Sequence, residues 1–217
     1  TAAIPFDRET QETYIFNVIA KDQGSPPRSS MAQVIVTIQD INDQAPEFNQ
    51  TLYTFPVEEN DMEERVIGIV QAHDNDKYPY NVFSYYIQPS GSMLEMFSID
   101  EDTGEFCTKM ALDREVAASY SVIVLAKDRG NPPQVGSTTV LVQVGDLNDS
   151  PPKFDFPSDT NNTVHVSIRA GIGHVVTRIR SHDMDSGNNA KVNYYIMSGN
   201  DLGFFGLDNN LDIISLN

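Results

Sequence analysis

The sequence repeats itself at a fixed interval of 106 residues, and this repeat constrains the fold more than any other feature. Three blocks recur at that interval: Phe/Leu-Asp-Arg-Glu, Ala-Lys-Asp followed by Gly-x-Pro-Pro, and Asp-x-Asn-Asp. The paired blocks begin at Phe6 and Leu112, at Ala20 and Ala126, and at Asp40 and Asp146. Three separate blocks in one register, without a gap, indicate tandem copies of a single structural unit.

A third copy begins later in the chain. The block His-Asp-x-Asp starts at His73 and again at His182, which is 109 residues further on, and the few extra residues fit a loop insertion. We therefore expect residues 1–43 to be the C-terminal part of one repeat, residues 44–149 a complete repeat, and residues 150–217 the N-terminal part of another.

Within each copy the pattern is that of a β-protein. Short runs rich in Val, Ile, Tyr and Thr alternate with turn clusters, and no window sustains a helical period. The expected strands cover residues 12–20, 32–40, 51–58, 65–72, 119–127 and 137–145. About seven strands in a unit of roughly a hundred residues suit an antiparallel β-sandwich. The predicted fold class is therefore all-β, with tandem sandwiches.

The charge balance excludes several classes of function. With 14 basic and 31 acidic residues the formal net charge is −17. Nucleic-acid binders carry a basic stripe, and anionic membrane surfaces attract basic segments, so this chain fits neither class. The single cysteine, Cys107, rules out an intrachain disulfide framework and a zinc cluster, and its apolar surroundings predict a buried structural thiol.

The recurring blocks are rich in side-chain oxygen. They comprise Asp-x-Glu, a lone Asp, Asn-Asp followed by Pro, and Asp-x-Asp with a later Asn. Carboxylates with amide and backbone carbonyls form hard-oxygen sites of high coordination number, which suit Ca²⁺ and not zinc. Without a metal, two carboxylates about 5 Å apart repel by roughly 3 kcal/mol at an effective dielectric near 20, so such a cluster is expected to be loose when empty.

In order and spacing, these blocks resemble the extracellular repeats of cadherins along nearly the whole chain. The resembling motifs are Leu-Asp-Arg-Glu, Asp-x-Asn-Asp-x-x-Pro, Asp-x-Asp-x-Gly-x-Asn and Ala-x-Asp before Gly-x-Pro. The resemblance implies seven-stranded Greek-key β-sandwiches that bind Ca²⁺ at the linkers between repeats. The Pro-Pro pair after the late Asp-x-Gly is similar to repeats of long non-classical members, the protocadherins and Fat-like proteins.

The resemblance also implies the calcium ligands. At the first junction they are Asp7, Glu9, Asn42, Asp43, the backbone oxygens of Ile41 and Gln44, and Asp74, Asp76, Asn81 and Asp128. At the second they are Glu59, Asp113, Glu115, Asn148, Asp149, the equivalent linker positions Leu147 and Ser150, and Asp183, Asp185 and Asn189.

Two departures from the family pattern weaken particular assignments. Lys77-Tyr78-Pro79-Tyr80 replaces the usual Gly after Asp76 and makes the approach to Asn81 one residue longer, whereas Asn189 follows Gly187 as expected. In the third repeat, Ser167-Ile168-Arg169-Ala170 stands where Glu-Asn is expected. Arg169 cannot ligate a cation, so we predict that the junction following the third repeat binds calcium poorly.

Other interpretations of these residues explain the repeated pattern less well. Asp113 and Glu115 could pass for a glycosidase carboxylate pair, but the pair recurs at Asp7 and Glu9 beside a repeat boundary. No catalytic triad, phosphate loop or zinc spacing stands out, so no enzyme is expected. His73 and His182 are expected to be structural or solvent-facing, since Ca²⁺ prefers oxygen. Asn49 and Asn161 begin N-glycosylation sequons.

The function that the resemblance implies is calcium-dependent cell–cell adhesion or recognition. The chain would be an extracellular rod segment, stiffened by Ca²⁺ at its junctions, of a single-pass protein of the cell membrane. Its partners would be other cadherin ectodomains, bound homophilically or heterophilically, with no nucleic acid. The alternative is a receptor ectodomain that binds a heterologous ligand without homophilic adhesion, and bead aggregation with and without calcium would distinguish the two.

Overall fold

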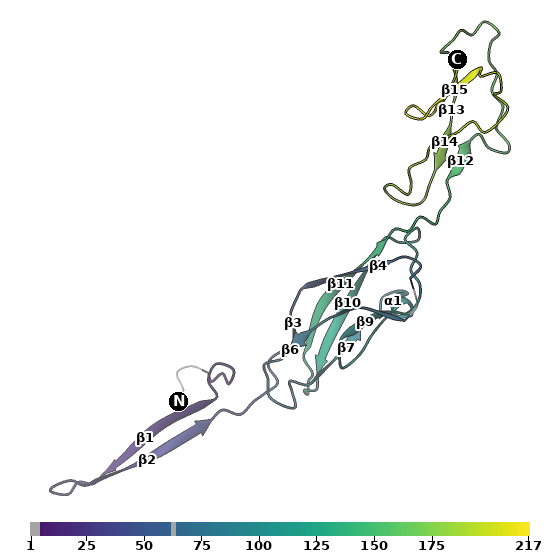
Figure 1. Ribbon diagram of the computed structural model, residues 1–217. Helices are drawn as coiled ribbons and strands as arrows, with labels where there is room; N and C mark the ends of the chain where they lie inside the picture. The colour runs from purple at the N-terminus through teal and green to yellow at the C-terminus, as the bar shows by residue number, and fades with distance from the viewer. Residues whose placement is uncertain (1–4, 62–63) are drawn as a thin grey trace. The chain divides into compact units, whose positions relative to one another are not determined.

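The computed structural model describes residues 5–61 and 64–217, and its secondary structure is almost entirely β (Figure 1). The described residues form two compact units. Unit 1 lies within residues 1–56, 62–111 and 120–143, and unit 2 comprises residues 57–61, 112–119 and 144–217. The division into three repeats at 1–43, 44–149 and 150–217 stays a prediction.

The first two strands form an antiparallel hairpin. β1 (Thr13–Lys21) and β2 (Ser29–Thr37) pair along their whole length, from Thr13 opposite Thr37 to Lys21 opposite Ser29. The expected strands 12–20 and 32–40 are confirmed, although β2 begins and ends three residues earlier than expected. Apolar residues on both faces of this hairpin, such as Ile15, Phe16 and Val18, are exposed.

The middle of the chain forms a β-sandwich. One sheet contains β4 (Leu52–Glu58), β11 (Val135–Gly145), β10 (Ser119–Asp128) and β7 (Phe83–Ile87), in that order. A second sheet contains β5 (Arg65–Ile69), β9 (Glu105–Thr108) and β8 (Phe97–Ile99). These sheets of four and three strands fit the seven strands predicted. A short pair, β3 (Glu47–Phe48) with β6 (Ala72–His73), and one helical turn, α1 (Met93–Met96), complete the sandwich.

The core of the sandwich follows the two-residue period of its strands. Along β10 every second residue is buried, including Val122 and Val124, because successive side chains point to opposite faces. Phe97 and Phe106 are almost fully buried, and their rings stack with centroids 5.5 Å apart. Cys107 is half-buried and not buried as expected, since it follows Phe106 along β9 and therefore faces the other side of the sheet.

The last part of the chain repeats only some of this architecture. β12 (Lys153–Phe156) pairs with β14 (Arg180–His182), as β3 pairs with β6. β13 (Val175–Arg178), β16 (Ile213–Leu216) and β15 (Phe205–Asp208) form a three-stranded sheet, in the same order as β5, β9 and β8. Residues 161–167 and 192–196, which match β4 and β7 at the offset of 109 residues, carry no strand. Their counterparts in the middle sandwich pair with β11 and β10, which have no equivalent in residues 150–217.

Candidate metal centres at the two repeat junctions

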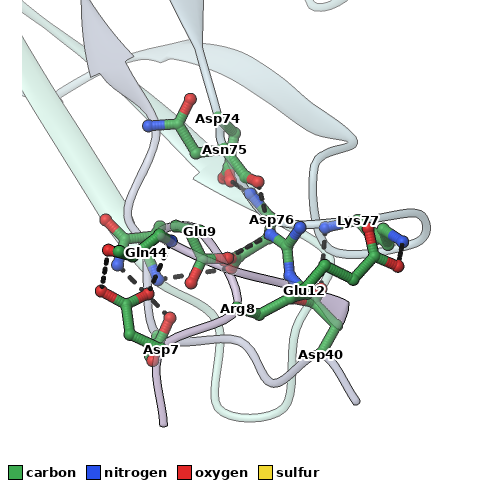
Figure 2. Close-up of polar contacts among 12 residues, drawn as sticks. Asp7, Arg8, Glu9, Glu12, Asp40, Gln44, Asp74, Asn75, Asp76 and Lys77 are labelled. Atoms are coloured by element: carbon green, nitrogen blue, oxygen red, sulfur yellow. Dashed lines mark hydrogen bonds and ion pairs between the residues drawn. The ribbon is translucent and has the colours of Figure 1, made fainter. Parts of the chain in front are cut away.

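The first cluster is a group of three carboxylates within unit 1. Glu9, Asp43 and Asp76 each bring one carboxylate oxygen within 4.8 Å of the others. Glu9 precedes β1, Asp43 lies between β2 and β3, and Asp76 follows β6, so the cluster joins three segments that are distant in the sequence. Figure 2 shows Glu9 and Asp76 close together in this cluster, next to Gln44.

The Asp-x-Asp loop leaves one oxygen of each carboxylate without a partner. Asp74 accepts a hydrogen bond through Oδ1 from the N–H of Asp76 (2.9 Å), and Asp76 accepts one through Oδ2 from the N–H of Gln44 (3.3 Å). Among the described residues, Asp74 Oδ2 and Asp76 Oδ1 are buried and have no hydrogen-bond partner. Burying an unpaired charged oxygen is unfavourable, and both oxygens have acceptor capacity available for a cation.

In Asp128 and Asn42, likewise, one polar side-chain atom forms hydrogen bonds and the other has no partner. Asp128 Oδ1 accepts hydrogen bonds from the N–H groups of Gly130 (2.9 Å) and Gln134 (3.0 Å), whereas its Oδ2 is buried and has no partner within the described chain. Asn42 donates through Nδ2 to the carbonyl of Pro132 (3.0 Å), and its Oδ1 is likewise buried without a partner. The predicted ligand types therefore present free oxygen atoms.

The electrostatics of this cluster are those of crowded anions. The pKa of Asp76 is raised to about 6, chiefly by burial; the hydrogen bond from Gln44 opposes this rise, and the charges of Asp74, Asp40 and Asp43 add to it. Burial also raises the pKa of Asp74, and the charge of Asp128 acts in the same direction. A bound cation would relieve both the desolvation and the repulsion.

The second cluster lies within unit 2 and contains two overlapping groups of carboxylates. Glu59, Asp113 and Glu115 form one group, and Glu115, Asp146 and Asp185 form the other, with ligand oxygens within 4.8 Å of one another in each. Glu59 is only 2% exposed and accepts hydrogen bonds from the N–H groups of Arg114 (3.0 Å) and Leu147 (2.5 Å). Burial raises the pKa of Glu115, and the hydrogen bond and charge of Glu59 add to that effect.

Its Asp-x-Asp loop repeats the geometry of the first. Asp183 Oδ1 accepts from the N–H of Asp185 (3.0 Å), and Asp185 Oδ1 accepts from the N–H of Ser150 (3.1 Å). Asp185 Oδ2 is buried and has no hydrogen-bond partner in the described parts of the chain. The same oxygen arrangement has thus formed twice from blocks in register.

The two predicted linkers between repeats have matching turns. The carbonyl of Ile41 accepts the N–H of Asp43 (3.0 Å), and the carbonyl of Leu147 accepts that of Asp149 (2.9 Å). A carbonyl oxygen retains a second lone pair, so both linker carbonyls still have acceptor capacity for a cation.

Several predicted ligands lie outside the three-carboxylate groups. Asp7 is one of them and caps the turn that follows it, accepting the N–H of Thr10 (3.3 Å). Asp113, a member of the second cluster, caps its turn in the same way and accepts the N–H of Val116 (3.1 Å). The Thr10 hydrogen bonds lower the pKa of Asp7. The other ligands outside these groups are Asn42, Asp74, Asn81, Asp128, Asn148, Asp149, Asp183 and Asn189.

The two asparagines that follow the Asp-x-Asp loops differ. Asn189 donates through Nδ2 to Asp146 Oδ2 (2.9 Å) and so joins the second cluster. Asn81 has a backbone hydrogen bond to the Lys77 carbonyl (3.4 Å) within the longer loop. The extra residue before Asn81 accounts for this difference.

Two residue pairs beside the clusters were missed by the sequence prediction. Asp146 belongs to the second cluster, and Arg114 forms ion pairs with both Asp146 and Glu115. Arg8 forms the same pairs with Asp40 and Glu9. A signal was available, because Arg and the first Asp of Asp-x-Asn-Asp recur at the same interval as the predicted ligands.

Both clusters fit a hard cation such as Ca²⁺ better than they fit zinc. Their grouped side chains offer oxygen alone, and each cluster contains at least one buried carboxylate oxygen that lacks a hydrogen-bond partner among the described residues. His73 and His182 lie outside these groups with half-exposed side chains, near Glu47 and Asp155 respectively.

Comparisons with known proteins identify the repeat. Residues 53–145 match the family model of the cadherin domain. The chain is 35% identical over 207 residues to Protein dachsous of Drosophila melanogaster, which covers 94% of this chain and 6% of that protein. It is 36% identical over 217 residues to Protocadherin Fat 2 of Rattus norvegicus, covering 100% of this chain and 5% of that protein. The chain spans 5–19% of the length of the curated relatives it matches.

Solved structures agree with this similarity. Extracellular cadherin domains 3–6 of Protocadherin Gamma B2 match with a TM-score of 0.78 and 31% identity, over 97% of this chain and 51% of that one. The Protocadherin gammaB7 EC3-6 cis-dimer structure matches with a TM-score of 0.81 and 30% identity, over the same two shares. No helix in the described residues is long and apolar enough to cross a membrane.

Proposed function

This chain belongs to the cadherin superfamily and is similar to its protocadherin and Fat-like members. We propose that its two clusters bind Ca²⁺ and that the chain functions in cell–cell adhesion or recognition. Cadherin repeats are adhesion domains and not enzymes. The alternative of a receptor ectodomain for an unrelated ligand is not favoured by these relatives.

The observation that carries the proposal is the set of buried oxygens without hydrogen-bond partners. They belong to Asn42, Asp74, Asp76 and Asp128 in the first cluster and to Asp185 in the second. Asp76 and Asp185 occupy equivalent positions, and each has its other oxygen bound to a linker N–H. Ca²⁺ would supply the positive charge that these oxygens lack, with several oxygen ligands at each site.

The proposed ligands are those that the family resemblance implied. For the first cluster they are Asp7, Glu9, Asn42, Asp43, Asp74, Asp76, Asn81 and Asp128 with the backbone oxygens of Ile41 and Gln44. For the second they are Glu59, Asp113, Glu115, Asn148, Asp149, Asp183, Asp185 and Asn189 with Leu147 and Ser150. The acidic groups, the unpartnered oxygens and the matching linker turns support these sets.

In this proposal residues 44–149 form one complete repeat, flanked by parts of its neighbours. Each cluster draws its carboxylates from the end of one repeat, from the linker and from the start of the next. Metal binding at such a cluster would restrict the linker, since the same ion would hold side chains from all three segments. A restricted linker would let successive repeats present an adhesive surface at a defined distance from the cell.

The proposed partners are other cadherin ectodomains on the extracellular side of the cell membrane. The similar Protocadherin gammaB7 EC3-6 structure is that of a cis-dimer, which supports a partner of the same family. The −17 charge of this chain is consistent with a surface that avoids nucleic acid.

Bead aggregation tests the adhesive function. Beads coated with this chain are expected to aggregate in millimolar-range calcium, at about the affinity of extracellular calcium modules, and to disperse with a chelator. The matched control is the double variant Asp76→Asn and Asp185→Asn, which keeps side-chain shape but removes one charge from each cluster. Aggregation that is equal with and without calcium would contradict calcium dependence, and absence of aggregation under both conditions would contradict homophilic adhesion by this segment.

A further inference from the structure

One arginine at each junction contacts three segments without the help of a metal. In the first cluster the guanidinium of Arg8 forms ion pairs with Asp40 and Glu9 and donates to the carbonyl of Asn75 (2.6 Å). Asn75 is the central residue of the Asp-x-Asp loop. Figure 2 shows Arg8 between Asp40, Glu9 and that loop.

Arg114 forms the equivalent ion pairs and the equivalent contact with a loop carbonyl. It forms an ion pair through Nε with Asp146 (2.5 Å) and another with Glu115, and it donates to the carbonyl of Met184 (2.6 Å). Asp146 and Glu115 lie 106 residues after Asp40 and Glu9, and Met184 lies 109 residues after Asn75. Two sites in two separate units have therefore reached the same arrangement.

The aspartate partner of each arginine also binds the following loop. Asp40 accepts the N–H of Lys77 (2.7 Å), and Asp146 accepts the N–H of Ser186 (2.9 Å). We call the set of Arg8, Asp40 and residues 75–77 the first clasp, and the set of Arg114, Asp146 and residues 184–186 the second clasp.

We propose that each clasp holds the start of the following repeat to the linker in the absence of calcium, and that Arg8 and Arg114 position Glu9 and Glu115 for the metal. The guanidinium is permanently charged and presents several N–H donors in a fixed plane, so it can bind two carboxylates and a carbonyl at once. The side chains of Arg8 and Asp40 are 11% and 12% exposed, and those of Arg114 and Asp146 are 15% and 14% exposed.

That low exposure distinguishes the clasps from surface ion pairs. Exposed pairs contribute little because water screens them, whereas partly buried charge-assisted hydrogen bonds are shorter and stronger. Each clasp also neutralises carboxylates beside the cluster, which lowers the repulsion that the metal-free state must tolerate. The positioning role follows from Glu115, because one of its oxygens is held by Arg114 while the residue belongs to both acidic groups.

Amide hydrogen exchange in excess chelator tests the first part of the proposal, with no calcium involved. In Arg114→Gln, the N–H of Ser186 is expected to exchange at least about tenfold faster than in the wild type, since local opening sets its exchange rate. The N–H of Lys77 is the internal control at the intact first clasp and is expected to keep its rate. Arg8→Gln is expected to give the reverse pattern.

A second variant keeps this test decisive if Arg114→Gln folds poorly. Asp146→Ala removes the acceptor and is expected to accelerate Ser186 exchange, while the amide of Val124 in the middle sandwich reports whether the fold is intact. An unchanged Ser186 rate in both variants overturns the clasp. Equal acceleration at Ser186, Lys77 and Val124 also overturns it, because that result means general destabilisation.

Calcium titration tests the positioning role, which rests on the proposed function. Arg114→Gln is expected to weaken calcium binding at the second cluster by about 10–100-fold, the effect typical of partners that orient metal ligands, and Arg114→Lys is expected to recover part of the loss. Unchanged or tighter binding in Arg114→Gln overturns the positioning role. Failure of the wild type to bind calcium overturns the proposed function and the positioning role, and leaves the chelator result on the clasp standing.

Discussion

The two clusters are built from the same motifs but differ in how many carboxylates they assemble. In the first, Glu9, Asp43 and Asp76 form one group, whereas in the second Glu115 belongs to two groups. The additional group contains Glu59, which is almost fully buried. Among the described residues, the second cluster therefore groups more carboxylates than the first.

The loops that follow the Asp-x-Asp motifs provide the other difference. Gly187 has φ +58°, a left-handed conformation that glycine adopts without strain, and the short loop brings Asn189 to Asp146. In the first cluster Lys77 takes part in an ion pair with Glu12, and Asn81 arrives one residue later. The repeated motifs place equivalent carboxylates in both clusters. The length of the loop after Asp-x-Asp determines whether the following asparagine contacts them.

The largest expected effect on calcium binding comes from replacing Glu115, the glutamate that belongs to both groups of the second cluster. Glu115→Gln is expected to weaken calcium binding at the second cluster by roughly 100-fold or more, because orienting partners alone contribute about 10–100-fold. Glu9→Gln is expected to have a smaller effect on the first cluster, since Glu9 belongs to a single group. Calcium titrations followed by NMR can measure both, with the N–H of Ser150 reporting the second cluster and that of Gln44 the first.

Equal losses in the two variants would remove the distinction between the clusters. Lys109→Gln is a suitable control for a change of charge elsewhere, since its Nζ donates to the carbonyl of Leu94 (2.8 Å) away from both clusters.

The next effect is on pH dependence at the first cluster. Because the pKa of Asp76 is raised from 3.8 to about 6, acidification through pH 6 protonates it, and calcium binding there is expected to weaken by up to about tenfold per pH unit. In the metal-free protein, acidification has the opposite effect and stabilises the folded state. The folded state binds this proton more tightly than the unfolded state, so stability is expected to fall as pH rises from 3.8 to about 6.

Calorimetric titrations at pH 7.5, 6 and 5, values chosen about the pKa of roughly 6, measure this linkage. Asp76→Asn is the matched variant and is expected to lose the Asp76 part of the pH dependence. A pH profile that is the same in Asp76→Asn and the wild type would contradict the role of this carboxyl.

A smaller effect concerns the two asparagines. Asn189→Ala is expected to weaken calcium binding at the second cluster by about tenfold, since it removes a hydrogen-bond donor to Asp146 and an amide oxygen beside the cluster. Asn81→Ala is expected to change the first cluster much less. A comparable loss at Asn81 would indicate that its amide reaches the cation despite the longer loop.

The smallest effect is expected from the loop glycine. Gly187→Ala has space for the added methyl group but retains a positive φ, which disfavours the folded loop by about 1 kcal/mol. This is expected to weaken calcium binding at the second cluster a few-fold. Gly199→Ala has the same strain at φ +78° away from the cluster, so it is expected to leave calcium binding unchanged.

Much of this architecture can be predicted from the sequence because the same motifs recur at a fixed interval, so each copy supports the interpretation of the others. Strand positions such as β4 and β10 were predicted within a residue at each end, since alternation and turn residues agree there. Cys107 was wrongly expected to be buried, because an apolar run in a strand places alternate residues on opposite faces.

The parts that the sequence did not predict depend on side-chain geometry across distant segments. Arg8 and Arg114 recur at the interval of the repeat, but the sequence of an acidic motif does not indicate which carboxylates its arginine binds. Their contacts to the loop carbonyls of Asn75 and Met184 require the fold, because the carbonyl of any residue is chemically the same. The expected ligands remain predictions until an ion is measured.

The most direct test of the calcium proposal is a calcium titration of the wild-type chain observed at single amides. Gln44 and Ser150 donate to Asp76 and Asp185, so their N–H resonances are expected to shift and saturate with calcium and to return with a chelator, while Val124 in the core of the middle sandwich stays unchanged. No shift at Gln44 or Ser150 up to about 10 mM calcium, well above the usual affinity of extracellular modules, would contradict the account.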